Sequence, residues 1–400
     1  MLSSLRVLDL TWVLGGPFAS QILAQLGAEV IKVESPDGDQ ARHYPPYYFE
    51  GDSSFFLSIN RGKKSVVIDL KNSEGRLVFD DLVKQADVVM YGFAPDVPVR
   101  LGIDFERLIT INPRIVVGQL IGLHDEGPYA TRPSFDIIAQ ALGGIMSITG
   151  EIDGRPTRVG YQVADLAAGL YLANGILAAV IHALKNNVGA KIQISLLDCQ
   201  LAMLTWQAQN YFVSGDMPQP LGTRHAMVAP SEVFRCADGR DIAISATTEQ
   251  FWKPFCAALN APALYTDPRF ATPALRIQHV AQLAAELEKI FATAPCDHWV
   301  RQLEAARVPV GKVNNVAEAV KQPLATIRNM VENLPHPVSG VAMQFLGNPF
   351  KYHSSTALTY PPKLGTATRA VLRTVCGYDN ERIDTLHKQG AIMLGQPESL

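Results

Sequence analysis

Asp165 is the side chain whose place in the chain most clearly suggests chemistry. It follows a glycine-containing turn, residues 155–164, and precedes a long apolar run, residues 166–184. Asp is a preferred residue at a helix N-cap, so position alone favours a capping role. A helix start also stabilises an ionised carboxylate, and an ionised carboxylate is a nucleophile toward an activated acyl group. The two roles are compatible, and the position by itself leaves both open.

Two cations follow expected strands. Arg100 stands beyond the strand at 86–93, and Lys71 follows the strand at 65–70. A cation beyond the carboxyl end of a strand in an open α/β sheet is well placed to bind phosphate. A solvated surface side chain explains the same positions equally well.

The first strand-to-helix turn, Val13-Leu14-Gly15-Gly16-Pro17, lies where a dinucleotide-binding protein carries GxGxxG. That fingerprint is absent, which argues against a nicotinamide cofactor. Close approach of the backbone to a ligand remains open at this turn, beside a purely structural tight turn. The chain also has no P-loop, HExxH or GxSxG motif. These absences argue against a nucleotide triphosphatase, a zinc protease and a serine hydrolase, and we expect no metal.

Composition narrows the class of protein. A chain of 400 residues suggests two domains. A net charge of −3 with scattered cations argues against nucleic acid and anionic membranes as partners. Five widely spaced cysteines without a CxxC pair fit a reducing cytoplasm. The N-terminus lacks the apolar segment of a signal peptide. The apolar run at 166–184 is interrupted by Asn174 and His182, so we expect a buried helix rather than a membrane span.

The pattern along the first half of the chain predicts an open α/β sheet. Short apolar runs alternate with helical patterns, which is typical of parallel βαβ units. The expected strands are 6–10, 29–34, 65–70, 86–93, 114–123 and 191–196. The expected helices are 17–26, 73–85, 135–143, the run at 166–184, and one from the last strand to about residue 212.

Proline and glycine mark a boundary after this half. We expect an N-terminal part of a large Rossmann-like domain at 1–214, a linker at 215–230 and a small α+β domain at 231–325. Residues 326–400 are expected to be a linker and a return to the large domain. The small domain should hold a hairpin at 232–235 and 241–245, followed by helices at 249–259, 279–293 and 298–306, and a last helix should cover 379–389.

An ordered set of short segments resembles the class III CoA-transferases, the family of formyl-CoA transferase and carnitine CoA-transferase (CaiB/BaiF type). Each segment is weak alone, but together they span nearly the whole chain in order. They are Val7–Thr11 with Gly16 and Pro17; Leu26–Glu34; Asn60–Ser65 with Asp69–Lys71; Gly127–Tyr129; Asp136 and Gln140; Gly160 to Asp165; Ala229, Pro230 and Phe234; Asp238 and Gly239; and Asp267–Phe270.

The resemblance implies a fold and a set of site residues. The family forms an interlocked homodimer, with a Rossmann-like large domain built from both chain ends and a small domain between them. Its catalytic aspartate falls on Asp165. Its CoA contacts fall on Val13, Leu14, Gly15, Lys71, Phe93 and Arg100. A CoA thioester is then a substrate, and no tightly bound cofactor is expected.

The chain departs from the family pattern at several places. Gly92 precedes Phe93 where many members carry Asn, and Leu14 replaces the glutamine of the formyl type. The glycine-rich run of the formyl type is also absent. These differences argue against a formyl or oxalate substrate. Phe135 stands before Asp136 where the related α-methylacyl-CoA racemases carry a catalytic His, so a two-base proton exchange lacks one base.

The acceptor acid is indicated only by polar side chains near Asp165 or in the linker. They are Arg158, Tyr161, Gln162, Arg224 and His225. Arginine suits bidentate carboxylate recognition, which favours a small dicarboxylate with succinyl-CoA as donor. A lone loop histidine such as His225 is more often solvated or structural. Two other functions stay open: an acyl-CoA racemase or isomerase, and a non-catalytic acyl-CoA-binding protein in which Asp165 is only a cap.

Overall fold

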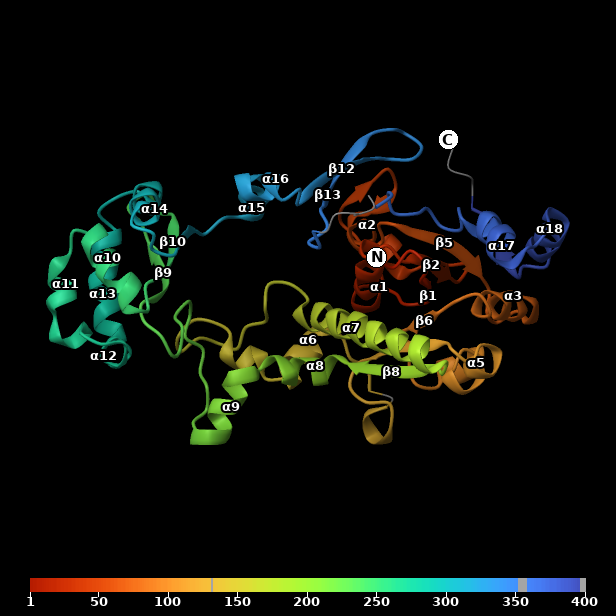
Figure 1. Ribbon diagram of the computed structural model, residues 1–400, viewed down its shortest axis with the longest axis horizontal. Helices are drawn as coiled ribbons and strands as arrows, with labels where there is room; N and C mark the ends of the chain where they lie inside the picture. Colours follow the sequence, from red (N-terminus) through yellow and green to blue (C-terminus); the bar gives the residue numbers. More distant parts are fainter. Residues whose placement is uncertain (131, 352–357, 396–400) are drawn as a thin grey trace. The chain divides into compact units, whose positions relative to one another are not determined.

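The computed structural model describes residues 1–130, 132–351 and 358–395. The chain divides into two compact units (Figure 1). The first unit consists of Met1–Met146, Arg158–Asp216 and Thr326–Leu400, and the second of Ser147–Thr157 and Met217–Ala325. The first unit contains Asp165 and both ends of the chain.

A seven-stranded sheet forms the centre of the first unit, in the order β14-β5-β2-β1-β6-β7-β8. Its strands are β1 (Arg6–Asp9), β2 (Glu29–Glu34), β5 (Lys63–Ile68), β6 (Val88–Tyr91), β7 (Val116–Ile121), β8 (Ala190–Ser195) and β14 (Ile392–Met393). All neighbours pair in parallel except β14, which runs antiparallel to β5. The chain steps from β1 to β2 on one side and later to β6 on the other. Open α/β sheets bind their ligands in a crevice at such a reversal, which in this chain falls at the carboxyl ends of β1 and β6.

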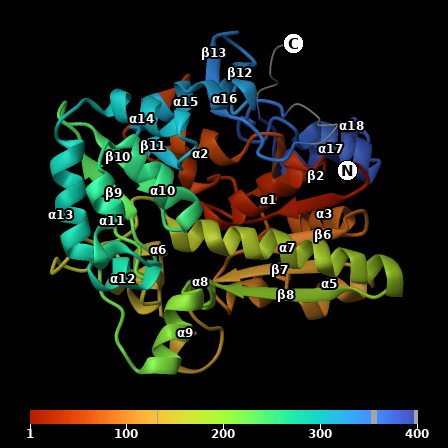
Figure 2. The same cartoon turned by 60° about the vertical axis from the view of Figure 1, so that its left-hand side comes forward.

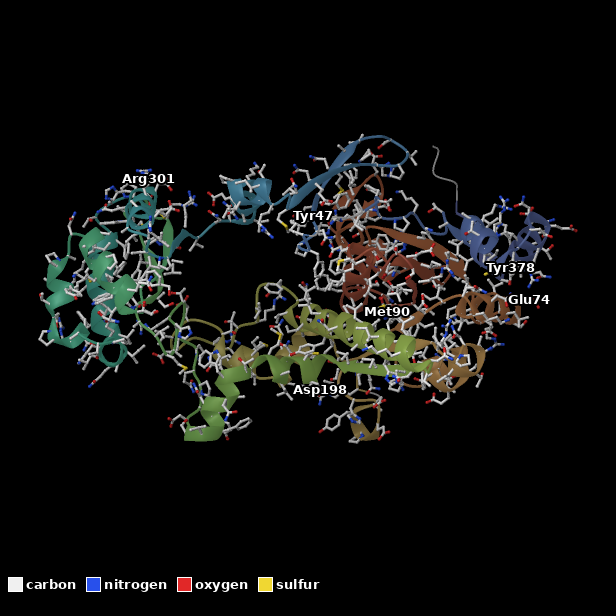
Figure 3. All side chains as sticks on the ribbon, viewed as in Figure 1. Tyr47, Glu74, Met90, Asp198, Arg301 and Tyr378 are labelled. Carbon is white, nitrogen blue, oxygen red and sulfur yellow. The ribbon has the colours of Figure 1, made fainter. Side chains whose placement is uncertain are left out.

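Alternating side chains of the strands pack into two helical layers. Val7 and Met90 face one layer, and Leu8 and Val89 face the other. Met90, in β6, is labelled in Figure 3. The first layer consists of α1 (Gly15–Gln25) and α7 (Val163–Asn186), and the second of α3 (Ser73–Val83), α5 (Phe105–Ile111), α17 (Thr368–Cys376) and α18 (Asn380–Lys388). Both faces of β1, β2, β6 and β7 are therefore buried, as continuous apolar runs predict. The edge strand β8 keeps one face exposed.

Helix α7 crosses from β7 to β8 and lies along them beside α1 (Figure 2). By length and composition alone it could span a membrane, yet 50% of its most apolar stretch is buried inside the structure. Its buried side, which includes Leu172 and Ile176, packs against α1 and the sheet. This packing is that of a core helix.

The remaining elements of the first unit connect the layers or extend them. They are η1 (Gln40–His43), β3 (Tyr48–Phe49), β4 (Asp52–Ser53), α2 (Ser54–Ile59), α4 (Val97–Leu101), η2 (Gly127–Tyr129), α6 (Asp136–Leu142), η3 (Ile145–Ile148, shared with the second unit), α8 (Leu196–Met203), α9 (Thr205–Ser214), α16 (Pro323–Ile327, at the boundary), β12 (Val331–Pro335) and β13 (Ala342–Leu346).

The second unit has an antiparallel sheet in the order β11-β10-β9, covered by helices. Its strands are β9 (Ser231–Arg235), β10 (Asp241–Ser245) and β11 (Val310–Lys312). Its helices are α10 (Glu249–Ala258), α11 (Pro262–Thr266), η4 (Pro268–Phe270), α12 (Pro273–Gln278), α13 (Val280–Phe291), α14 (Cys296–Ala305) and α15 (Val316–Lys321). The predicted hairpin is confirmed, and so are the helices around 249–259, 279–293 and 298–306.

The parallel α/β sheet is confirmed, with β2 at its predicted bounds. Three predictions about elements were wrong in detail. Helix α1 begins at Gly15 rather than Pro17. The helix expected to run to about 212 is two helices, because Thr205 has a left-handed backbone with φ 43° that ends α8. The return of the chain was expected to contain one last helix, but α17 and β14 also belong to it.

Candidate active site

Asp165 is the third residue of α7 and is half-buried. Gln162 occupies the N-cap position, and its side chain makes no capping hydrogen bond. The expectation that Asp165 caps this helix was therefore wrong. The capping hydrogen bond comes from another helix, because the Ala164 amide donates to Oδ1 of Asp136 at 2.8 Å. The Asp165 carboxylate is left free for another role.

Asp136 belongs to a buried network that fixes the approach to α7. It stands in the first turn of α6, and its Oδ2 accepts a 2.6 Å hydrogen bond from Nε2 of Gln140. Oε1 of the fully buried Gln140 accepts the Val159 amide at 2.9 Å. The two side chains thus hold both the turn before α7 and the start of the helix. These hydrogen bonds from α6 fix the start of α7 and with it the position of Asp165.

The surroundings of Asp165 disfavour its charged form. Burial, and second the nearby negative charge of Asp136, raise the pKa of Asp165 from 3.8 to about 7. Among the described residues its side chain has no hydrogen-bond or ion-pair partner that would offset these effects. The helix start favours the charged form of this carboxylate, whereas burial and the like charge of Asp136 act against it and raise its pKa. An unpaired carboxyl group with a raised pKa is typical of a reactive site.

The first strand-to-helix turn lies directly against Asp165. Because α1 follows β1 and α7 follows β7, both helices begin at the carboxyl edge of the sheet. A Cβ on Gly15 would stand 3.0 Å from the Asp165 carbonyl oxygen, and one on Gly169 would stand 2.6 Å from the Gly15 carbonyl oxygen. Glycine at both positions is what allows the two helix starts to touch.

The turn itself has an unusual backbone. Val13 has φ 64°, a left-handed conformation that a β-branched residue rarely adopts. Leu14 is buried and occupies the N-cap of α1 without any side-chain capping bond. Gly16 packs against Thr11, where a Cβ would come within 2.3 Å of the Thr11 side chain. The first amides of α1 therefore have no side-chain acceptor, next to Asp165.

Aromatic side chains contact one another at the carboxyl ends of β1 and β6. Phe93 follows β6, its ring centroid lies 6.1 Å from that of Trp12, and it stacks on Tyr91 at 6.3 Å. The Trp12 indole N–H donates to the Gly92 carbonyl oxygen at 3.2 Å, which ties the end of β1 to the end of β6. The sequence prediction named Phe93 and not Trp12. The place of Trp12 directly before the first turn was the available sequence signal.

The two predicted cations are both exposed at the carboxyl edge of the sheet. Arg100 lies in α4, and its guanidinium stands 3.4 Å from Asp96 in an ion pair open to solvent. Lys71 follows β5, and the described residues give its ammonium group no ion-pair partner. A solvent-exposed ion pair of this kind is weak, so both cations are available to a ligand.

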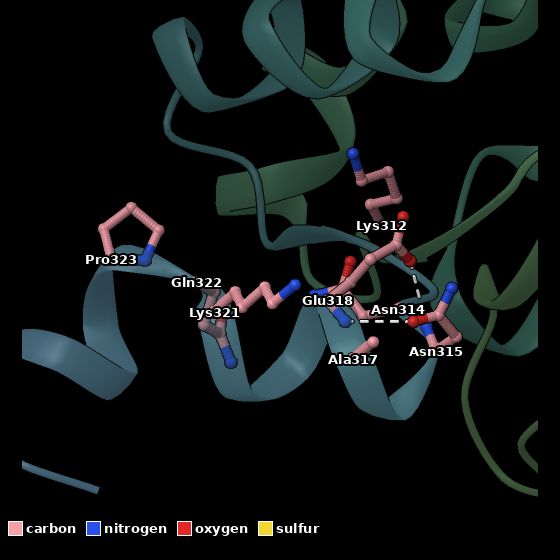
Figure 4. Close-up of a pocket in the computed structure, with 8 residues that line it drawn as sticks. All are labelled: Lys312, Asn314, Asn315, Ala317, Glu318, Lys321, Gln322 and Pro323. Carbon is pink, nitrogen blue, oxygen red and sulfur yellow. Dashed lines mark hydrogen bonds between the residues drawn. The ribbon is translucent and has the colours of Figure 1, made fainter. Parts of the chain in front are cut away.

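The side chains expected around the acceptor acid are divided between the two units. Arg158 and Tyr161 are exposed in the segment before α7, next to Gln162. Arg224 and His225 belong to the second unit and line an open pocket of about 510 Å³ on its sheet. Another pocket of the second unit, lined by residues between Lys312 and Pro323, contains none of the predicted site residues (Figure 4).

In the second-unit pocket, Arg224 is already engaged with Glu232. Nε of Arg224 lies 3.4 Å from Oε2 of Glu232, while Oε1 of this glutamate is buried without a hydrogen bond. Burial raises the pKa of Glu232 despite the nearby guanidinium. The long, single contact leaves most donors of Arg224 available.

Comparisons with known proteins identify the family of the chain. The model of CoA-transferase family III matches residues 2–368. The chain is 41% identical over 318 residues to an acetyl-CoA:oxalate CoA-transferase of Acetobacter aceti, covering 79% of this chain and 81% of that protein. It is 34% identical over 398 residues to the succinyl-CoA:glutarate CoA-transferase of Mus musculus, covering 98% and 90%.

A solved structure has the same fold along most of its length. The crystal structure of a CAIB/BAIF family protein from Brucella suis superposes with a TM-score of 0.81 at 34% sequence identity, covering 93% of this chain and 98% of that one.

Proposed function

The chain belongs to CoA-transferase family III, and we propose that it moves CoA from succinyl-CoA, or a similar small acyl-CoA, to a small dicarboxylate, with Asp165 as the nucleophile. The observation that supports this best is the position of Asp165. Its carboxylate is half-buried and unpaired, has a pKa raised to about 7, and adjoins the first turn at the ligand-binding crevice of the sheet.

The first half of the proposed reaction moves CoA onto the enzyme. The Asp165 carboxylate attacks the carbonyl carbon of the donor thioester, and CoA leaves as its thiolate. This gives a mixed anhydride between Asp165 and the donor acid. The thiolate then attacks the Asp165 carbonyl carbon, the donor acid leaves as a carboxylate, and an aspartyl-CoA thioester remains.

The second half repeats these steps with the acceptor. The acceptor carboxylate attacks the aspartyl-CoA carbonyl and expels the thiolate, which forms a second anhydride. The thiolate attacks the acceptor's carbonyl carbon, giving the new acyl-CoA and free Asp165. Every step exchanges one acyl bond for another, so the cycle consumes neither ATP nor a proton. Water has to be excluded, because it would hydrolyse the anhydrides and the thioester.

The electrostatics around Asp165 favour this chemistry. Burial and Asp136 destabilise the charged carboxylate, as its raised pKa shows. Both covalent intermediates are neutral at Asp165, so forming either one removes the repulsion from Asp136. The same surroundings therefore make the free carboxylate more reactive and the acylated one more stable. We propose the amides at the starts of α1 and α7 as donors to the tetrahedral oxyanions; loss of one such donor typically slows a reaction by about 10²–10³-fold.

We propose that the CoA moiety binds along the crevice. Val13, Leu14 and Gly15 would contact it through the turn, and Phe93 would contact it through its ring. Lys71 and Arg100 would hold the phosphates, since both are exposed and available.

The acceptor is proposed to be a dicarboxylate because relatives named for oxalate and for glutarate both use one. Arg158, Tyr161 and Gln162 would contact it from the turn before α7. The chain lacks the sequence pattern of the formyl type, which argues against oxalate as the acceptor. The similarity to an acetyl-CoA:oxalate CoA-transferase argues for oxalate. Activity with a panel of acids of increasing length decides between oxalate and a longer dicarboxylate.

We also propose that the chain forms the interlocked homodimer of its family. Helices α6 to α9 expose large apolar side chains that a monomer would leave in water. The most exposed are Phe135, Leu184, Phe212 and Val213, at 71%, 72%, 73% and 79%. Light scattering coupled to size-exclusion chromatography should give twice the chain mass; a monomer would exclude the dimer.

The test of the proposed function uses succinyl-CoA with oxalate, malate, mesaconate, itaconate and glutarate, and identifies the products by mass spectrometry. A new CoA thioester with any acid, absent in Asp165→Ala, supports transfer and names the acceptor. Turnover by Asp165→Ala close to that of the wild type would refute the role of Asp165. Incorporation of solvent deuterium at the donor α-carbon without a new thioester would instead indicate a racemase.

A further inference from the structure

A buried ion pair bonds to the turn from Thr11 to Val13 at both of its ends, while Asp9 accepts the Thr11 amide at 2.9 Å. Nζ of Lys32 lies 2.8 Å from Oδ2 of Asp39, and each side chain is only 1% exposed. The same ammonium group donates to the Thr11 carbonyl oxygen at 2.8 Å. Oδ1 of Asp39 accepts the Val13 amide at 3.1 Å. The two side chains of this ion pair therefore make hydrogen bonds to the backbone immediately before and immediately after Trp12.

The two charged residues reach the turn from a neighbouring strand and the loop after it. Lys32 stands in β2, and Asp39 is the N-cap of η1, where its Oδ1 also accepts the Ala41 amide at 2.9 Å. Opposite charge keeps Lys32 ionised in this site: although burial acts to lower the pKa of Lys32, Asp39 and the carboxylates of Asp9 and Glu34 raise it overall. Lys32 is thus held in its charged form.

The backbone that this ion pair holds is one that Val13 would not adopt by itself. At φ 64° a β-branched residue is disfavoured by about tenfold or more in population relative to the right-handed region. Such a conformation persists only where the surrounding structure imposes it. The conformation directs the chain from β1 into α1, so it fixes where the amides after Leu14 lie beside Asp165.

We infer that the Lys32–Asp39 ion pair is a positioning device for acyl-CoA binding, which holds the turn at Thr11–Val13 in its strained conformation and so presents the start of α1 to the thioester. This inference rests on the proposed function. Stability alone explains the ion pair poorly, because buried ion pairs are often no more stabilising than apolar residues of the same size. The hydrogen bonds of this ion pair to both sides of the strained turn are a more specific explanation for the ion pair.

A double-mutant cycle between residues 39 and 13 tests this. Asp39→Asn removes the charge that holds Lys32, and Val13→Gly removes the backbone strain, because glycine adopts a positive φ without cost. In the wild-type background, Asp39→Asn should raise KM for succinyl-CoA about tenfold, with a smaller change in kcat. In the Val13→Gly background, the same substitution should raise KM less than about threefold. The pair replacement Lys32→Met with Asp39→Asn leaves no lone buried charge and should behave as Asp39→Asn does.

Two further measurements separate positioning from general stability. Ser65→Ala is the matched control: it removes the buried 2.6 Å hydrogen bond that Ser65 donates to Glu34 and the 2.9 Å bond that it accepts from the Gly365 amide. Neither bond involves residues 11–13, so KM should stay unchanged. Amide hydrogen exchange of residues 11–16 needs no ligand, and should become faster in Asp39→Asn while the strands keep their protection.

The outcomes distinguish the inference from the function on which it rests. Equal increases in KM in the wild-type and Val13→Gly backgrounds, together with unchanged exchange at 11–16, would overturn the positioning role even in an active transferase. Faster exchange at 11–16 in a protein that shows no transfer would support the positioning of the turn and refute the proposed function.

Discussion

Replacing Asp165 by Asn should stabilise the folded protein at alkaline pH while removing its activity. Burial and Asp136 raise the pKa of Asp165 from 3.8 to about 7. Below pH 3.8 the group is protonated in both the folded and the unfolded chain, so it costs nothing. Between 3.8 and 7 only the unfolded chain loses the proton, so the free energy of unfolding falls as pH rises. Above about 7 the loss is complete.

The magnitude follows from this difference in pKa. The interval from 3.8 to about 7, at about 1.36 kcal/mol for each pH unit, sets an upper limit of about 4 kcal/mol. Asp165 is only half-buried and keeps some contact with water, so we reduce this to about 2 kcal/mol. At about 2 °C for each kcal/mol in a domain of this size, Asp165→Asn should raise Tm by about 4 °C above pH 7.

Scanning calorimetry from pH 4.5 to 8.5 measures this difference. The advantage of Asp165→Asn should grow up to pH 7 and then stay constant. Asp81→Asn is a control of opposite sign in the same unit. Burial acts to raise the pKa of Asp81, but hydrogen bonds from Lys84 and Tyr378 outweigh burial and lower it below 3.8. The stabilisation from Asp81 is lost only on acidification, so this substitution should lower Tm by an amount that stays nearly constant from pH 4.5 to 8.5. A Tm difference for Asp165→Asn that does not vary with pH would refute the reasoning.

Three further predictions concern activity. The wild-type kcat/KM should rise with pH to a plateau above about 7 as Asp165 loses its proton. Asp136→Asn keeps an oxygen that can accept the Ala164 amide but removes the negative charge, so it should move this rise to lower pH. A pH profile that does not move would rule out electrostatic control by Asp136. Arg100→Ala should raise KM for the acyl-CoA about tenfold with kcat little changed, as initial rates would show, because a phosphate contact is lost; an unchanged KM would exclude that contact. Gly15→Ala should lower kcat by about tenfold or more in the same assay. The added Cβ would stand 3.0 Å from the Asp165 carbonyl oxygen and displace the nucleophile. Full activity would show that the turn can move to accommodate the added Cβ without displacing Asp165.

Much of the sheet was predictable from sequence because its strands are short apolar runs bounded by glycine or polar residues. β2 is the clearest case, and the helix covering 166–184 is real and packs in the core. The strand β14 was missed because two residues carry too little pattern. Only pairing with β5, more than 300 residues earlier, makes them a strand.

The position of Asp165 at a helix start was predictable, but its electrostatics were not. Sequence spacing suggested that Asp165 is a cap, whereas the capping oxygen belongs to Asp136, 28 residues before the Ala164 amide that it accepts. A contact of that separation leaves no local signal. The same limit applies to Lys32 and Asp39, whose only sequence sign was a charged residue inside a buried strand. The roles assigned to Arg158, Tyr161, Gln162, Arg224 and His225 stay predictions.

The central claim is that Asp165 carries CoA covalently between donor and acceptor. The most direct test is to mix the protein with succinyl-CoA without acceptor, quench in acid, digest, and search the peptides by mass spectrometry. We predict a peptide containing Asp165 whose mass is increased by that of CoA less one water. This added mass should disappear when an acceptor acid is added, and the Asp165→Ala protein should never show it. Sustained transfer with CoA attached to a different residue, or to none, would contradict it.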